Sequence, residues 1–112
     1  MGLHSNLPIY KVSYDLIGVV VDAARQMPRD VKRLLGEKLR DECIELSLLI
    51  YDANVATDKR TPLTTLLRRL QAIEIMLRVS RDKRWISIQQ YAGAVQLTDQ
   101  IGKQANGWKK SQ

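Results

Sequence analysis

A chain of 112 residues has room for one domain with a modest core, and too little for a core plus an elaborate catalytic cleft. The formal charge of +6 and the pI near 9.7 favour an acidic partner. No apolar run reaches the roughly 18 residues of a membrane span, and the N-terminus lacks the basic and apolar segments of a signal peptide. A cytoplasmic location is therefore expected.

The first two predicted helices are marked by apolar residues at steps of three and four. They run from about residue 8 to 26 and from about residue 30 to 56, on either side of Met27-Pro28-Arg29. The first apolar face consists of Ile9, Val12, Leu16, Val19, Val20 and Ala23. The second consists of Val31, Leu35, Leu39, Cys43, Leu46, Ile50 and Ala53. Cys43 is the only cysteine, and its spacing predicts a small core residue.

The third predicted helix follows a break at residues 57–60. Thr61 is expected as its N-cap, and Pro62 suits the first helical position because its missing N–H costs nothing there. The core face of this helix consists of Leu63, Leu66, Leu67, Leu70, Ile73 and Leu77.

The fourth predicted helix has the clearest start. Ser87 is expected as the N-cap, Gln90 completes a capping box, and Ile86 and Tyr91 are spaced for a hydrophobic staple. The predicted core face consists of Ile88, Tyr91, Ala92, Val95, Gly102 and Ala105. Short connections make successive helices antiparallel neighbours, so residues 8–110 are predicted to form an all-α, up-down-up-down four-helix bundle after a disordered tail at residues 1–7.

A second set of apolar residues lies away from these core faces, on the first and third predicted helices. The set consists of Tyr10, Tyr14, Ile17, Val21, Ala72, Ile75, Met76 and Val79. Contiguous exposed apolar patches mark interfaces, which favours self-association of the bundle. The alternative is that these are scattered apolar residues of the kind common on any surface.

The sequence contains no recognisable constellation for catalysis, for a metal or for a cofactor. The only histidine, His4, lies in the expected tail without a partner at metal-ligand spacing. Glu42 and Glu45 are three residues apart, but a carboxylate-bundle metal site also needs histidines, so they are interpreted as a solvated acidic face. The chain is therefore expected to be no enzyme and to use no cofactor.

The excess positive charge falls in the second half of the chain. Residues 1–59 carry eight Lys and Arg against nine Asp and Glu, net −1, whereas residues 60–112 carry ten against three, net +7. The candidate contacts to nucleic-acid phosphates are Arg68, Arg69, Arg78, Arg81, Lys83, Arg84, Lys103, Lys109 and Lys110. The antiparallel topology predicts that Lys83 and Lys110 lie at opposite ends of the bundle.

Two alternatives stay open for these basic and aromatic residues. Cations at the end of a helix are stabilised by its dipole, so the charge could be a solvated face alone. Trp85 and Trp108 could stack on bases or serve as packing residues at helix termini.

Several short motifs, in this order and spacing, resemble a known family. They are Leu7-Pro8-Ile9-Tyr10, Pro28 with Leu35-Gly36, Leu77-Arg78-Val79-Ser80-Arg81-Asp82, Ile86-Ser87 with Tyr91, and Ile101-Gly102 with Gly107-Trp108-Lys109-Lys110-Ser111. The family includes Avd, the accessory variability determinant of diversity-generating retroelements, and the proteins encoded by intervening sequences in bacterial large ribosomal RNA genes. The resemblance spans roughly residues 8–111.

The resemblance implies a homopentamer of four-helix bundles that forms a tapered barrel with a basic surface. In the retroelement branch it implies binding to the reverse transcriptase and to nucleic acid during mutagenic copying of a template RNA into cDNA. Arg78 and the Gly107–Lys110 ending match the family motifs. The function predicted from the sequence is therefore a non-enzymatic, nucleic-acid-binding accessory protein of a retroelement. The alternative is a structural bundle of the intervening-sequence type.

Overall fold

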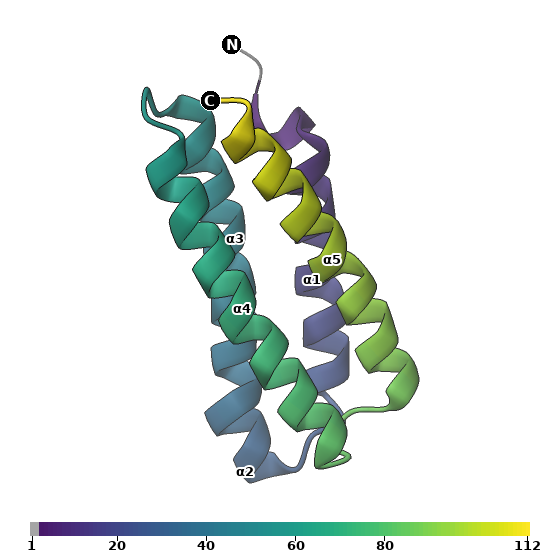
Figure 1. The fold of residues 1–112 in the computed structure, drawn as a ribbon. Coiled ribbons are helices and arrows are strands. Elements are labelled where there is room, and N and C mark those ends of the chain that lie inside the picture. Colours follow the sequence, from purple (N-terminus) through teal and green to yellow (C-terminus); the bar gives the residue numbers. More distant parts are fainter. Residues whose placement is uncertain (1–2) are drawn as a thin grey trace.

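The computed structural model of the chain describes residues 3–112, and its helices form an antiparallel four-helix bundle (Figure 1). The four rods of the bundle are α1 (Pro8–Ala24), α3 (Glu37–Val55), α4 (Arg60–Asp82) and α5 (Ile88–Lys110). Helices α1 and α4 each pack against both α3 and α5, so the rods occupy the corners of a square. The bundle measures 43 × 21 × 20 Å. The predicted all-α, up-down-up-down architecture is confirmed.

The second predicted helix is one helical run with a widened turn near its start. A short helix α2 (Arg29–Val31) leads into a π-helical turn, η2 (Lys32–Gly36), which continues into α3. Gly36 is buried, and a Cβ at this position would lie 3.3 Å from the Cβ of Ala24 and 3.4 Å from the sulfur of Met27. The absence of a side chain at Gly36 therefore allows this run to approach the end of α1 closely.

Asp58, and not Thr61, caps the start of α4. The Arg60 N–H donates to one Asp58 carboxylate oxygen at 3.1 Å, and the Thr61 hydroxyl donates to the other. The hydrogen bond from Thr61 holds the pKa of Asp58 below its ordinary value. The prediction of Thr61 as N-cap was wrong because helical backbone already begins at Lys59. The ammonium of Lys59 donates to three carbonyls at the end of α3, which satisfies acceptors that the helix leaves free.

The start of α5 has the predicted capping box. The Gln90 N–H donates to the Ser87 hydroxyl at 3.0 Å, and the Ser87 N–H donates to the Gln90 side chain at 2.9 Å. Ile86 is buried and Tyr91 is half-buried beside this turn.

The predicted core face of α5 was largely wrong. The buried residues of this helix are Ala94, Thr98, Ile101 and Ala105. Of the six predicted residues only Ala105 is among them, while Ile88 is 78% exposed and Ala92 is exposed. Most of the buried residues of α5 are small or polar, so they give only a weak helical periodicity of hydrophobicity. The prediction instead followed the larger apolar residues near the start of the helix.

The core follows the predicted faces of the other three helices. Its largest fully buried apolar side chains are Leu16, Leu39, Leu46, Ile50, Leu63, Leu66, Ile73, Leu77 and Ile101. Cys43 is fully buried, as predicted, and burial raises the pKa of its thiol to about 12. None of the described helices is long and apolar enough to span a bilayer.

Part of the expected disordered tail forms a short turn in the structure. His4–Asn6 form a 3-10 turn, η1, and the His4 ring meets the rings of Tyr10 and Tyr51 edge-on, with each pair of ring centroids 5.0 Å apart. These contacts hold the turn against α1 and α3. Residues 1–2 of the expected tail lie outside the described part of the chain.

Candidate nucleic-acid interface

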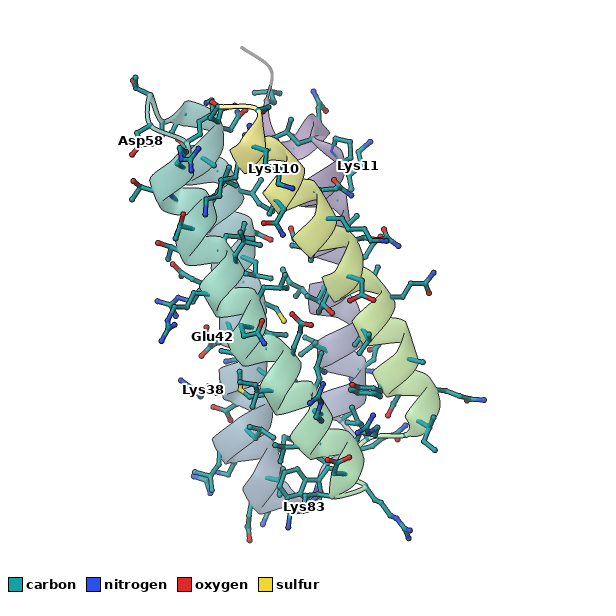
Figure 2. All side chains as sticks on the ribbon, in the orientation of Figure 1. Lys11, Lys38, Glu42, Asp58, Lys83 and Lys110 are labelled. Atoms are coloured by element: carbon teal, nitrogen blue, oxygen red, sulfur yellow. The ribbon has the colours of Figure 1, made fainter. Side chains whose placement is uncertain are left out.

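The predicted cations are divided between the two ends of the bundle. Figure 2 shows Lys83 and Lys110 at opposite ends, as the antiparallel topology predicted. Because the bundle is 43 Å long, these lysines cannot form one compact patch within a single copy.

The end at which α2 lies also gathers cations from the first half of the chain (Figure 1). We call residues 25–40 and 78–88 the basic end. Residues 25–40 carry six Lys and Arg and two Asp and Glu, net +4, and residues 78–88 carry four and one, net +3. The basic end therefore has a net charge of +7 by residue count. Asp22 and Asp41 at its border pair with Arg25 and Arg40, and counting these two carboxylates gives this end +5 and the rest of the chain +1.

Sequence reasoning missed half of this charge because it compared the two halves of the chain. The missed cations of the basic end are Arg25, Arg29, Lys32, Arg33, Lys38 and Arg40. The break at Pro28 and the turn after α4 lie at the same end of an antiparallel bundle. A sum of the charges near each predicted turn would therefore have predicted the positive charge of the basic end from the sequence.

Two of the predicted contact residues are engaged within the chain. Arg69 on α4 donates to Glu42 on α3 at 2.8 Å, and the Glu42 side chain is only 14% exposed. The interpretation of Glu42 as part of a solvated face was therefore wrong. Arg81 donates twice to Asp82, at 3.0 and 2.8 Å, and lies 4.5 Å over the ring of Tyr91. Both guanidinium groups have their charge compensated locally, which makes them poorer phosphate ligands.

The other predicted contact residues keep their charge at the surface. Arg68, Arg78, Lys83, Arg84, Lys103 and Lys110 are exposed, and Lys109 is half-buried. Burial and the nearby Asp99 raise the pKa of Glu74 above its ordinary value, and Arg78 lies close enough to oppose this shift. Of the exposed cations, Arg78, Lys83 and Arg84 belong to the basic end.

Arg84 has an unusual backbone conformation. Its φ is 61°, in the left-handed region, and it is the one non-glycine residue with positive φ between residues 3 and 112. The Trp85 N–H donates to the Ser80 carbonyl at 2.9 Å, and the Arg84 N–H donates to the Arg81 carbonyl at 3.0 Å. These two bonds form a Schellman motif, in which glycine is the usual residue at the position that Arg84 occupies.

The predicted apolar stripe on α4 is exposed, whereas that on α1 is mostly packed. Ile75 is 58% exposed, Val79 39% and Tyr14 65%, and Ala72 is also exposed. The remaining predicted interface residues are half-buried: Tyr10, Ile17, Val21 and Met76. Tyr10, Ile17 and Met76 pack against the core, so their apolar surface is largely satisfied within one copy.

Helix α3 carries an exposed apolar stripe that was not predicted. It consists of Ile44, Leu48, Tyr51 and Val55, which are 40–53% exposed. Their steps of four, three and four place them on one face, opposite the buried residues of α3. This spacing is present in the sequence, but only the more strongly apolar core stripe of the same helix was predicted.

The exposed stripes lie on helices of opposite net charge. Helix α1 has one Lys and two Asp, and α3 has two basic and five acidic residues, so together they carry −4. Helix α4 has five basic and two acidic residues, and α5 has three and one, so together they carry +5. One side of the bundle is therefore apolar and acidic, and the other is apolar and basic.

The titratable residues form no metal centre in the part of the chain that the structure describes. No three His, Cys, Asp or Glu side chains within residues 3–112 lie together as a metal site requires. The chemistry that the surface supports is the binding of anions by Lys and Arg side chains and the burial of apolar stripes against a partner.

These features define a small four-helix-bundle protein with a strongly basic end and exposed apolar stripes. A family model described as bAvd-like matches residues 8–112, and the chain belongs to this family. No curated protein and no solved structure gives a significant match.

Proposed function

We propose that the protein is a non-enzymatic accessory protein of a diversity-generating retroelement that binds RNA or DNA through its basic end. Membership of the bAvd-like family supports the retroelement role. The observation that carries the binding role is a net charge of +5 at one end of the bundle, with its border carboxylates Asp22 and Asp41 counted, against +1 for the rest of the chain. A field of one sign over such an end attracts a polyanion, and contacts of Lys and Arg with phosphates do not depend on base sequence.

The binding proposal is tested by two charge-matched double variants. Arg29→Gln with Arg33→Gln removes two positive charges from the basic end, and Lys109→Gln with Lys110→Gln removes two from the opposite end. Binding of an RNA oligonucleotide is measured by filter binding at several salt concentrations. The first variant is expected to lower the slope of log affinity against log salt by about 2, and the second to leave the slope almost unchanged. Equal effects of both variants, or no binding by the wild type, would refute the basic end as the interface.

A second part of the proposal is scaffolding of the reverse transcriptase. The protein would hold the polymerase and its template RNA or cDNA together, without a chemical step of its own. A reverse transcriptase gene next to paired template and variable repeats would support this role. The direct test is co-purification of the two proteins at moderate salt, with and without nuclease. Loss of the reverse transcriptase from the nuclease-treated sample would contradict a direct contact.

We further propose that the bundle assembles with copies of itself, as the family resemblance implies for a pentamer. The exposed apolar stripe on α3 includes Leu48 and lies on an acidic helix, whereas the exposed apolar stripe on α4 includes Ile75 and lies on a basic helix. The two stripes therefore complement each other in charge, and both offer apolar surface. Contact between two different faces is heterologous, and such contacts close into a ring when the rotation between copies permits. Each copy in a ring would present its basic end in the same direction, which multiplies the charge offered to nucleic acid.

A further inference from the structure

We propose that the basic end contains a site for one unstacked nucleotide of a single-stranded nucleic acid, beside the turn between α4 and α5. The base would pack against Ile88 and Trp85, and its phosphate would contact Arg84. This inference rests on the proposed nucleic-acid binding and adds to it a preference for single strands at a defined place.

The first observation is a concavity of about 680 Å³ between the end of α1 and the turn from α4 to α5. Ligand sites in proteins have volumes of about 300–1,000 Å³ and combine an apolar lining with a few polar groups. The apolar lining here includes Trp85, Ile86 and Ile88, and the polar lining includes Gln26, Asp82 and Arg84. The concavity therefore offers apolar surface for a base, amide and carboxylate groups for its edges, and a guanidinium for a phosphate.

The second observation is Ile88, which is 78% exposed at the first residue of α5. It borders the concavity, and the half-buried Trp85 lies in the same lining. A single exposed isoleucine is common on protein surfaces. Together with Trp85, however, Ile88 provides apolar surface within a group of cations. Stacking of a base on an aromatic ring such as Trp85 tolerates any base sequence, and Ile88 extends the apolar surface beside that ring.

The third observation is the left-handed backbone of Arg84. A non-glycine residue in this conformation is disfavoured by contacts of its Cβ with the backbone, so glycine would fit the turn better. The arginine side chain is exposed and lines the concavity, which places its five N–H donors where a phosphate could receive them. A side chain that contributes to binding explains why an arginine occupies this position.

The local charges favour an anion at the concavity. Asp82 is the acidic residue in its lining, and its carboxylate already accepts two hydrogen bonds from Arg81. Arg84 has no carboxylate partner among the ion pairs of residues 3–112. The charge of Asp82 is therefore offset, and that of Arg84 remains for a ligand.

A duplex would not use this site, because its bases are stacked and paired and cannot enter a concavity between helix ends. A single strand can turn one base out of the stack, which is how sequence-tolerant single-strand sites work. A single strand would therefore gain the base contact in addition to the phosphate contacts that both ligands share.

The test compares binding of a 12-nucleotide single-stranded RNA and a duplex of the same length. Ile88→Gln changes no charge, and because Ile88 is exposed the variant should fold normally. It is expected to weaken single-strand binding about tenfold, because it removes apolar surface that the base would bury, and to leave duplex binding unchanged. Arg84→Gln should weaken single-strand binding more than duplex binding, whereas Arg33→Gln, with the same loss of charge, should weaken both equally.

A spectroscopic measurement adds an independent readout. In the Trp108→Phe background, Trp85 is the only tryptophan. Its fluorescence should be quenched by the single strand and not by the duplex. If both ligands bind but Ile88→Gln leaves their affinity ratio unchanged, the nucleotide site is refuted and the proposed binding at the basic end stands. If neither ligand binds at low salt, the proposed binding itself is refuted.

Discussion

Replacing Arg84 by glycine should stabilise the protein, although it removes a surface arginine. The reason is the backbone, because Arg84 has a φ of 61° and provides the left-handed residue of the Schellman motif that ends α4. A side chain in this region costs about 1–2 kcal/mol. Glycine also has more conformational freedom in the unfolded chain, and this entropy opposes folding by about 0.5–1 kcal/mol. The net stabilisation expected for Arg84→Gly is therefore about 0.5–1 kcal/mol.

Thermal unfolding followed by circular dichroism measures this difference. A gain of about 0.5–1 kcal/mol should raise Tm by about 2–6 °C in a domain of this size. Arg84→Gln is the matched control, since it removes the same charge and keeps the left-handed side chain. Lys83→Gly is a second control, because Lys83 has helical backbone with a φ of −82°. Glycine at that position should lower Tm.

The comparison between the two variants at residue 84 decides the prediction. Any relief of repulsion among the cations of the basic end appears in both variants, so their difference reports the backbone alone. If Arg84→Gly unfolds at the same temperature as Arg84→Gln, or lower, the cost assigned to this conformation is wrong. The left-handed backbone of Arg84 would then no longer indicate that the arginine is retained for binding.

Three further predictions concern assembly, pH and the thiol. Ile75→Glu and Leu48→Glu should each give monomers by light scattering, and an equimolar mixture should form a 1:1 dimer through the one intact junction. Two separate monomers in the mixture would exclude a heterologous contact. The lowered pKa of Asp58 means that its stabilisation is complete well above the ordinary value of 3.8 and is lost as pH falls through the lower folded value. The stability difference between wild type and Asp58→Asn should accordingly shrink below about pH 3.8, and a constant difference would contradict this. Cys43 should resist alkylation at pH 8 until the protein unfolds, since burial raises its pKa to about 12, and rapid labelling of the folded protein would contradict the buried position.

The helices and most of the core could be predicted from the sequence because they depend on local periodicity. Steps of three and four marked the buried faces of α1, α3 and α4, where large aliphatic residues such as Leu16, Leu46 and Leu66 recur. The capping box at Ser87 was also predicted, since it needs only residues that are neighbours in sequence. The same logic failed where the signal was weak, on the core face of α5, whose buried residues are small or polar.

The position of the charges in space could not be predicted by comparing the halves of the chain. Sequence alone determined an excess of +6 and the presence of four amphipathic helices. Only the tertiary structure brought residues 25–40 to the same end of the bundle as residues 78–88, which gives this end +5 with Asp22 and Asp41 counted. It also decided that Arg69 pairs with Glu42 on the neighbouring helix and that Arg84 has no such pair within residues 3–112. Helix formation is a property of nearby residues, whereas ion pairs and charged ends depend on which distant residues the packing brings together.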